Sequence, residues 1–112
     1  MTGKEFLKCG MEFPGTQADC PFSETDAQVL RHVENRKWFA LLFRLDGKEC
    51  ANVKCDPAAA SFWRGLYQGI KPAWHMNKEH WIMVELESDV PPEEIRSLLY
   101  ISYQLTAKRK KG

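Results

Sequence analysis

The stretch from Pro72 to Trp81 holds the densest group of chemically versatile side chains in the sequence. It contains two tryptophans, two of the three histidines, an asparagine and a lysine. Histidine, together with cysteine elsewhere in the chain, could bind a metal or supply a nucleophile and its base. Aromatic, amide and lysine side chains instead suit stacking on bases, hydrogen bonding to base edges and contact with phosphates. Metal binding, catalysis and nucleic-acid binding are therefore the three chemistries to weigh.

The spacing of cysteines and histidines argues against a metal site. Cys50 and Cys55 lie five residues apart on one predicted strand, so their side chains should point to opposite faces. His75 and His80 have the same spacing, although a turn between them could bring their rings together. Neither a CxxC nor an HExxH pattern is present. The sequence predicts no metal and no cofactor.

Nucleophilic catalysis would require a cysteine or serine beside a histidine that a third group holds in place. Cys9 is expected on the buried stripe of a helix, Cys55 on an inward strand face, and His32 at a strand edge near a turn. The seven glycines are scattered over turns and helix ends, so they form no phosphate-binding loop. We therefore expect a non-enzymatic protein.

Nucleic-acid binding has the more coherent case. A hairpin over the opening stretch would gather its polar and aromatic side chains, with Lys71 at its entrance and Asn52 and Lys54 on an adjacent strand. The basic tail would add an electrostatic arm. The candidate contact residues are Asn52, Lys54, Lys71, Trp74, His75, Asn77, Lys78, His80, Trp81, Lys108, Arg109, Lys110 and Lys111. Each also has a structural interpretation: buried tryptophans, an asparagine that serves the turn, a solvated lysine tip and a fraying helix end.

Length and charge limit the possible functions further. The 112 residues suit one domain, residues 1–107, followed by the basic tail 108–112. The net charge is +1, but without the tail twelve basic residues face fifteen acidic ones, a balance of −3. Nucleic acid could then be bound only by a local patch or by the tail. No apolar run spans a membrane, and charges at Lys4, Glu5 and Lys8 interrupt any signal-peptide core. We expect a cytoplasmic protein with reduced thiols and no membrane contact.

Local signals divide the first half of the chain into a helix and three strands. Thr2-Gly3-Lys4-Glu5 is a capping box, which predicts a helix to about Phe13 that Pro14-Gly15 ends. A loop over 16–26 follows, with Phe22 tucked against the body. Strands are predicted over 28–33, 37–45 and 48–55, the last two joined by a type I′ turn at Asp46-Gly47. The second of these strands is almost entirely apolar, which indicates that both its faces are largely covered.

The second half predicts two helices around a hairpin. Asp56 and Pro57 suit the N-cap and first position of a helix that Gly69 would end. Strands are predicted over 73–76 and 80–86, joined by a turn at 77–79. A last helix follows Pro91-Pro92, with an inward stripe formed by Ile95, Leu98, Leu99, Ser102 and Leu105. The predicted class is α+β: two layers, an antiparallel sheet of about five strands and three helices, in the order α-β-β-β-α-β-β-α.

Several of these motifs resemble the MmcQ/YjbR family. The similar elements are Asn52-Val53-Lys54-Cys55-Asp56-Pro57, the run from Gly69 to Lys78 with its His75-Met76-Asn77-Lys78, and His80-Trp81. Pro14-Gly15, Asp19–Phe22, Lys37–Leu41 and Val90–Leu105 are also similar, so the resemblance covers nearly the whole chain. It implies a secretion-chaperone-like or frataxin-like α+β domain. Members are commonly labelled DNA-binding on the basis of a proposed "double wing" shape. One departure is Met83, where the family often has threonine.

The sequence thus supports more than one function. The first expectation is a non-enzymatic module that binds DNA or RNA through the hairpin and basic residues. The alternative is an adaptor or chaperone-like protein that binds another protein, for which an exposed apolar patch would be needed. A small-molecule pocket beside the hairpin is a third interpretation. A monomer is the expected state.

Overall fold

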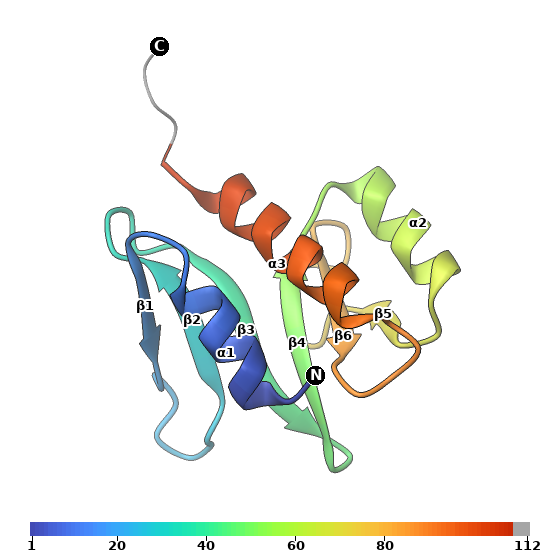
Figure 1. Cartoon of the computed structure of the whole chain (residues 1–112), viewed down its shortest axis with the longest axis horizontal. Helices are drawn as coiled ribbons and strands as arrows, with labels where there is room; N and C mark the ends of the chain where they lie inside the picture. The colour runs from blue at the N-terminus through green and yellow to red at the C-terminus, as the bar shows by residue number, and fades with distance from the viewer. Residues whose placement is uncertain (109–112) are drawn as a thin grey trace.

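The computed structural model describes residues 1–108, which form three helices and one six-stranded sheet (Figure 1). The class is α+β with an antiparallel sheet, as predicted, with six strands where about five were expected. None of the helices in this part of the chain is long and apolar enough to cross a membrane. In chain order the elements are α1 (Gly3–Met11), β1 (Thr16–Asp19), β2 (Gln28–His32), β3 (Trp38–Leu45), β4 (Lys48–Lys54), α2 (Pro57–Leu66), β5 (Ile70–Pro72), β6 (Trp81–Glu85) and α3 (Pro92–Thr106).

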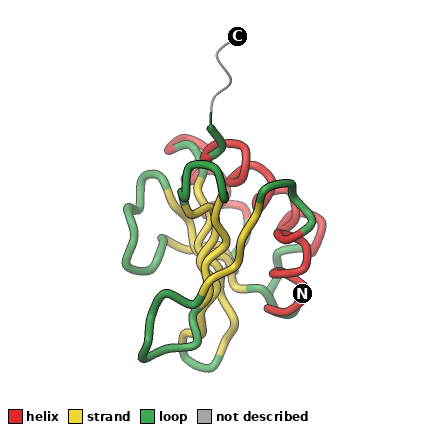
Figure 2. The backbone as a smooth tube through the Cα atoms, turned by 90° about the vertical axis from the view of Figure 1, so that its left-hand side faces the viewer, coloured by secondary structure: helices red, strands yellow, loops and turns green. Residues whose placement is uncertain are grey.

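The sheet has helices on one face and loops on the other (Figure 2). Its strand order is β1-β2-β3-β4-β6-β5, and every neighbouring pair is antiparallel. The main core lies on the helical face, where all three helices contribute buried side chains such as Phe6, Ala60 and Leu99. A smaller apolar cluster occupies the opposite face. Both faces of the central strands are therefore covered, as the apolar sequence of β3 predicted.

The short-range signals of the sequence are confirmed at several helix and strand ends. Thr2 and Glu5 form the expected capping box at α1. Asp46 and Gly47 both have positive φ angles, as the hairpin turn requires. Asp56 is the N-cap residue of α2, although its side chain makes no capping hydrogen bond. That helix ends at Leu66, so the prediction that Gly69 ends it is wrong. Gly69 instead passes so close to Ser88 that a Cβ atom would collide with it.

Two strands differ from the prediction. The 16–26 segment, expected to be a loop, contains β1, which pairs with β2 along four residues and whose Asp19 forms an ion pair with Arg31. The strand expected over 73–76 lies three residues earlier, as the short edge strand β5. Residues 73–80 are therefore a loop of eight residues and not one arm of a tight hairpin. Pro72 tolerates this edge position because no backbone donor is needed there.

A β-bulge in β3 sets which side chains face the helices. The register with β2 shifts between Leu30 and Arg31, so Phe39 is an extra residue on β3. As a result Phe39 and Ala40 both pack on the helical side, while Trp38 packs on the opposite side. The Ser102 hydroxyl of α3 donates to the Phe39 carbonyl and accepts from the Lys54 amide. This buried hydroxyl supplies hydrogen bonds to both strands where their ladder stops.

His32 is the last residue of β2, next to the turn that was expected there, and its side chain is buried. Its ring packs against Phe39 and Tyr103, with centroid distances of 5.1 and 4.6 Å. Its Nε2 atom lies 2.9 Å from the Thr106 hydroxyl on the last turn of α3. Burial lowers the pKa of the imidazole below its usual value. Leu105, predicted on the inward stripe of that helix, is 40% exposed, and Thr106 takes the buried place.

This burial predicts a loss of stability in mild acid. Below the ordinary histidine pKa the unfolded chain binds a proton at His32 that the folded chain does not, so the free energy of unfolding falls as pH falls. The loss is at most about 1.4 kcal/mol per pH unit. Urea unfolding at pH 7.5 and 5.5 measures it. The wild type should lose more stability over this interval than His32→Gln, whereas His80→Gln, at an exposed histidine, should behave like the wild type. Equal losses in all three proteins would contradict the assignment.

Candidate functional site: a groove beside the 73–80 loop

A cavity of about 990 Å³ opens on the helix-free face of the sheet. Two loops border it, the Cys20–Ala27 loop and the Ala73–His80 loop, and both project from this face in Figure 2. Its floor belongs to a buried apolar cluster made of Val29, Leu41, Phe43, Cys50 and Met83. We call this cavity the groove. The groove is lined by residues 21–27, Trp38, Leu41, Phe43, Arg44, Trp74, His75 and Met76.

Aromatic pairs form both sides of the groove. On one side Trp74 stacks on Phe43 with their ring centroids 5.0 Å apart and their planes 19° apart. On the other side Phe22 meets Trp38 edge to face, at 5.9 Å. Phe22 and Trp74 remain 40% and 38% exposed. Large aromatic rings that stay partly exposed beside an apolar floor are typical of recognition surfaces.

Asn52 attaches the Ala73–His80 loop to the centre of the sheet. This residue lies on β4 and is fully buried. Its side-chain amide donates to the Trp74 carbonyl at 2.8 Å, and its side-chain oxygen accepts from the Trp74 amide at 3.3 Å. Both polar groups of the Trp74 backbone are thereby paired. Asn52 was a candidate for direct contact with nucleic acid, but the structure makes it a positioning residue that orients Trp74.

The rest of the loop is held by its own side chains. The Asn77 side-chain oxygen accepts from the amides of Glu79 and His80, the turn role considered for it. The Lys78 ammonium donates to the Ala73 carbonyl at 2.9 Å. His75 has a φ angle of 57°, in the left-handed region that non-glycine residues rarely occupy. Such strain persists only where the surroundings impose it and is frequent at functional sites.

The structure separates the remaining predicted contact residues. Trp74 and His75 line the groove, whereas Lys54, His80 and Trp81 do not. Lys71 lies on β5 and pairs with Glu85, which also binds Lys48. Lys108 pairs with Glu34 beside the β2–β3 turn. Arg109, Lys110 and Lys111 lie outside the described residues. β5 and β6 do form a hairpin, and Lys54 faces Trp81 on the neighbouring strands β4 and β6. Its connection, however, is an eight-residue loop and not the predicted tight turn, so the polar and aromatic side chains do not all gather on one surface.

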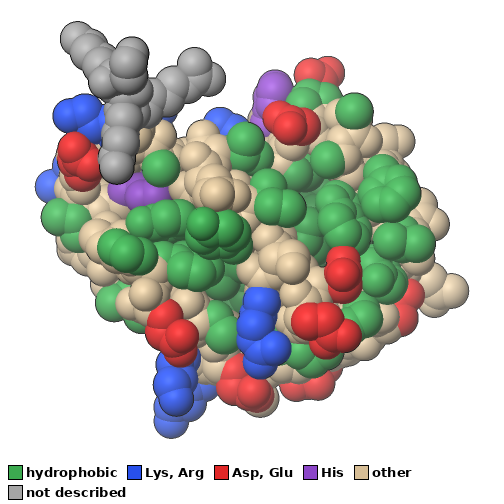
Figure 3. All heavy atoms as spheres, turned by 45° about the horizontal axis from the view of Figure 1, so that its top comes forward, with side chains coloured by type: hydrophobic (Ala, Val, Ile, Leu, Met, Phe, Trp, Pro, Cys, Tyr) green, Lys and Arg blue, Asp and Glu red, His purple; other side chains and the backbone are tan. Residues whose placement is uncertain are grey.

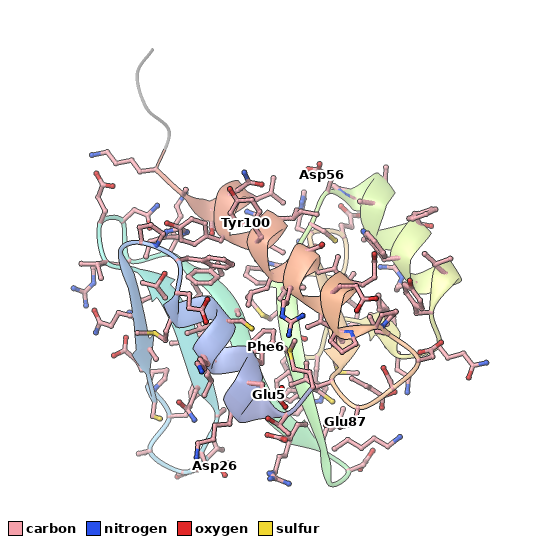
Figure 4. All side chains as sticks on the ribbon, in the orientation of Figure 1. Glu5, Phe6, Asp26, Asp56, Glu87 and Tyr100 are labelled. Carbon is pink, nitrogen blue, oxygen red and sulfur yellow. The ribbon has the colours of Figure 1, made fainter. Side chains whose placement is uncertain are left out.

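Charge around the groove is mixed. Glu24 and Asp26 are exposed on the first loop, and Figure 4 labels Asp26 at the edge of the molecule. Arg44 comes from β3 and is also exposed. The guanidinium of Arg31 lies 5.9 Å from the Trp38 ring centre while it pairs with Asp19, so this cation is already compensated. The groove is thus an apolar channel with carboxylates on one rim and a cation on another.

Bond-making chemistry finds little support in this arrangement. Within residues 1–108 no three histidine, cysteine or acidic side chains gather closely enough to hold a metal ion. Cys50 and Cys55 point to opposite faces, as predicted, and burial raises the pKa of both thiols. A raised pKa disfavours the thiolate, which is the reactive form.

Sequence reasoning missed most of this site, since Trp74 and His75 are the two lining residues that it had named as candidates. Phe22, Trp38, Leu41 and Phe43 were expected only as scaffold. One signal was available: β3 was predicted to be covered on both faces while the helices were expected mainly on one face. The other face therefore had to be covered by loops, and the apolar residues beneath those loops were candidates for a pocket.

The fold and groove define a two-layer α+β domain with an aromatic-lined cavity on its helix-free sheet face. Comparison with known proteins places this domain more narrowly. The YjbR family model matches residues 11–105. The Bacillus subtilis (strain 168) protein YyaQ, described as uncharacterized, is 34% identical over 95% of this chain and 98% of its own length. The chain belongs to the YjbR family.

Other relatives agree with this assignment. Escherichia coli (strain K12) YjbR, also described as uncharacterized, is 29% identical over 93% of this chain and 86% of that protein. A crystal structure of a Pseudomonas syringae protein superposes with a TM-score of 0.87 at 35% identity, covering 96% of this chain and 100% of that one. A Deinococcus radiodurans protein gives a TM-score of 0.83 at 28% identity, over 93% and 77% of the two chains.

Loss of the Asn52 side chain should destabilise the fold. In Asn52→Ala the part-buried N–H and C=O groups of Trp74 lose their partners. A fully buried unpaired group costs about 1–3 kcal/mol, so the two groups together should cost about 2 kcal/mol or more. Urea unfolding followed by tryptophan fluorescence would measure the change. Asn77→Ala is the matched control, because it removes an asparagine that bonds exposed backbone amides in the same loop, and it should cost about 1 kcal/mol or less. Equal losses in the two variants would contradict the positioning role of Asn52.

Proposed function

We propose that this protein is a non-enzymatic adaptor that binds an extended, apolar segment of a partner protein in the groove. The observation that carries the proposal is that two partly exposed aromatic rings, Phe22 and Trp74, both line the groove beside a buried apolar floor. An extended segment points alternate side chains to opposite sides. Every second side chain could therefore enter the groove between the two aromatic rings, while the intervening ones remain in water.

Charge supports a protein segment over a nucleic acid. Nucleic-acid sites concentrate uncompensated lysine and arginine on the binding surface. Here Arg44 is the one lysine or arginine among the described residues that line the groove, and Lys48, Lys71 and Lys78 lie outside the lining. Phosphates along the groove would also meet Glu24 and Asp26. An uncharged segment suffers no such repulsion.

Display of random twelve-residue peptides on phage would test the proposal. Selection against the protein should enrich peptides with apolar residues at alternate positions. Trp74→Ala and Phe22→Ala should each weaken a selected peptide by about tenfold or more, because each removes a partly exposed ring that would pack on it.

Phe62→Ala is the matched control for these variants. Phe62 is also an exposed aromatic residue, at 62% exposure, but it lies on α2 and not in the groove. Its loss should leave peptide affinity unchanged. Failure to enrich any peptide, or equal losses in Phe62→Ala and Trp74→Ala, would refute the adaptor proposal.

Nucleic-acid binding is a second candidate, favoured by one specific observation. Trp74 is 38% exposed and its ring contacts that of His75, so a base has an aromatic surface on which to stack. Lys78 lies in the same loop, and the tail could meet phosphates from outside the described residues. This candidate would be a single-stranded DNA or RNA site, because an unpaired base can reach Trp74.

Fluorescence anisotropy with labelled single- and double-stranded DNA and RNA distinguishes the two candidates. If the second is correct, binding weakens with salt, and deletion of residues 108–112 lowers the salt dependence because fewer counterions are released. Trp74→Ala then weakens single-strand binding, and Lys78→Ala weakens binding to all sequences. Absence of binding at low salt and high micromolar protein would refute nucleic-acid recognition while leaving the adaptor proposal in place.

A further inference from the structure

The outward side of α2 lacks the charged residues that a surface helix normally carries. Six of its ten residues are exposed and none of the six is charged: Pro57, Ala58, Ser61, Phe62, Gly65 and Leu66. By contrast the exposed residues of α1 include Lys4, Glu5 and Lys8. Helices that are apolar on both sides are normally covered on both sides.

α2 also packs sparingly on its own sheet. Ala60 is its only fully buried residue. Its large side chains lie at the surface, with Phe62 and Leu66 exposed by 62% and 51%, and Trp63 and Tyr67 half-buried. Phe62, Trp63 and Tyr67 contact one another in series, at centroid distances of 5.5 and 6.3 Å. Figure 3 shows hydrophobic side chains gathered over this part of the molecule. We call Ala58, Phe62, Trp63, Leu66 and Tyr67 the α2 surface.

Carboxylates border the α2 surface at both ends of the helix. Asp56 is exposed at the N-terminal end, where Figure 4 labels it. At the C-terminal end, the Asp89 carboxylate accepts from the backbone amides of Gln68 and Gly69, both at 2.7 Å. Burial and the nearby carboxylates of Glu94, Asp89 and Glu93 raise the pKa of the Tyr67 phenol at the same end. Arg64, the one charged residue of α2, donates toward the Lys78 carbonyl in the 73–80 loop. The α2 surface is therefore apolar in its middle and acidic at both ends.

From this arrangement we infer that the α2 surface is a docking site for a basic amphipathic helix of another protein. The apolar stripe of such a helix would pack on Phe62 and Leu66, whose spacing of four residues forms one ridge for helix packing. Its basic residues would meet Asp56 at one end and Glu93 and Glu94 at the other. Ten helical residues span about 15 Å, so these basic residues would lie about three turns apart.

Charge also selects this partner over a second copy of the chain. If two α2 helices packed antiparallel about a twofold axis, Asp56 of one copy would face the Glu93 and Glu94 carboxylates of the other. Like charges at both ends would then oppose the dimer. A basic helix would instead place positive charge opposite both acidic ends of α2. The α2 surface lies on the helical face, opposite the groove, so the inference does not depend on the proposed function.

The test uses two designed eighteen-residue helical peptides and a scrambled one. The first carries leucines along one stripe with lysines and arginines at its flanks; the second replaces those basic residues with glutamate. Fluorescence anisotropy at low salt should give at least about tenfold tighter binding for the basic peptide than for the acidic or scrambled ones. Phe62→Ser and Leu66→Ser should each weaken it by about tenfold, because the apolar contact is lost. Circular dichroism checks that both variants fold.

Two further variants test the contribution of charge to binding and distinguish the α2 surface from the groove. The double variant Glu93→Gln, Glu94→Gln should weaken the basic peptide by about threefold to tenfold and reduce its salt dependence. Phe22→Ala, in the groove, should leave the peptide affinity unchanged. Equal binding of basic and acidic peptides, or full binding by Phe62→Ser, would overturn the inference. So would sedimentation that shows a dimer dispersed by Leu66→Ser, since the second copy would then be the occupant.

Discussion

The pairing between Asn52 and the Trp74 backbone is the interaction on which the helix-free face depends. A buried amide on a central strand pairs with both polar groups of one loop residue. Because an unpaired group there would be costly, the loop has one favoured position over the sheet. That position stacks Trp74 on Phe43 and gives the groove one of its two sides. Asn52, which the sequence suggested as a contact residue, instead fixes the position of Trp74 beside the groove.

The apolar side chains on the two faces of the sheet are covered in different ways. On the helical face, three helices cover the strands and exclude water from a continuous core. On the other face, two loops cover the apolar cluster incompletely and leave partly exposed rings. Met83 is part of the floor and contributes an apolar side chain to it. On the helical face, α2 also leaves apolar side chains exposed, among them Phe62 and Leu66.

The features that the sequence predicted correctly are those that depend on residues close together in the chain. The capping box at Thr2 and Glu5 and the turn at Asp46-Gly47 depend on residues within four positions of each other, and both are confirmed. Side-chain alternation also assigned Cys55 to an inward face, and Cys55 is part of the main core. In contrast, β1 owes its strand conformation to pairing with β2, and His32 owes its burial to Thr106, 74 residues away. The groove joins loops that are about 50 residues apart, which no local pattern contains.

The bulge at Phe39 has a consequence for how this chain can change in length. Because side chains alternate along a strand, one extra residue reverses the orientation of everything before it. Deleting a residue there would turn Trp38 from the groove toward the helices. Phe22 would then lose its edge-to-face contact with Trp38. A change in the length of the Cys20–Ala27 loop would instead alter one wall of the groove without reversing the side chains of β3.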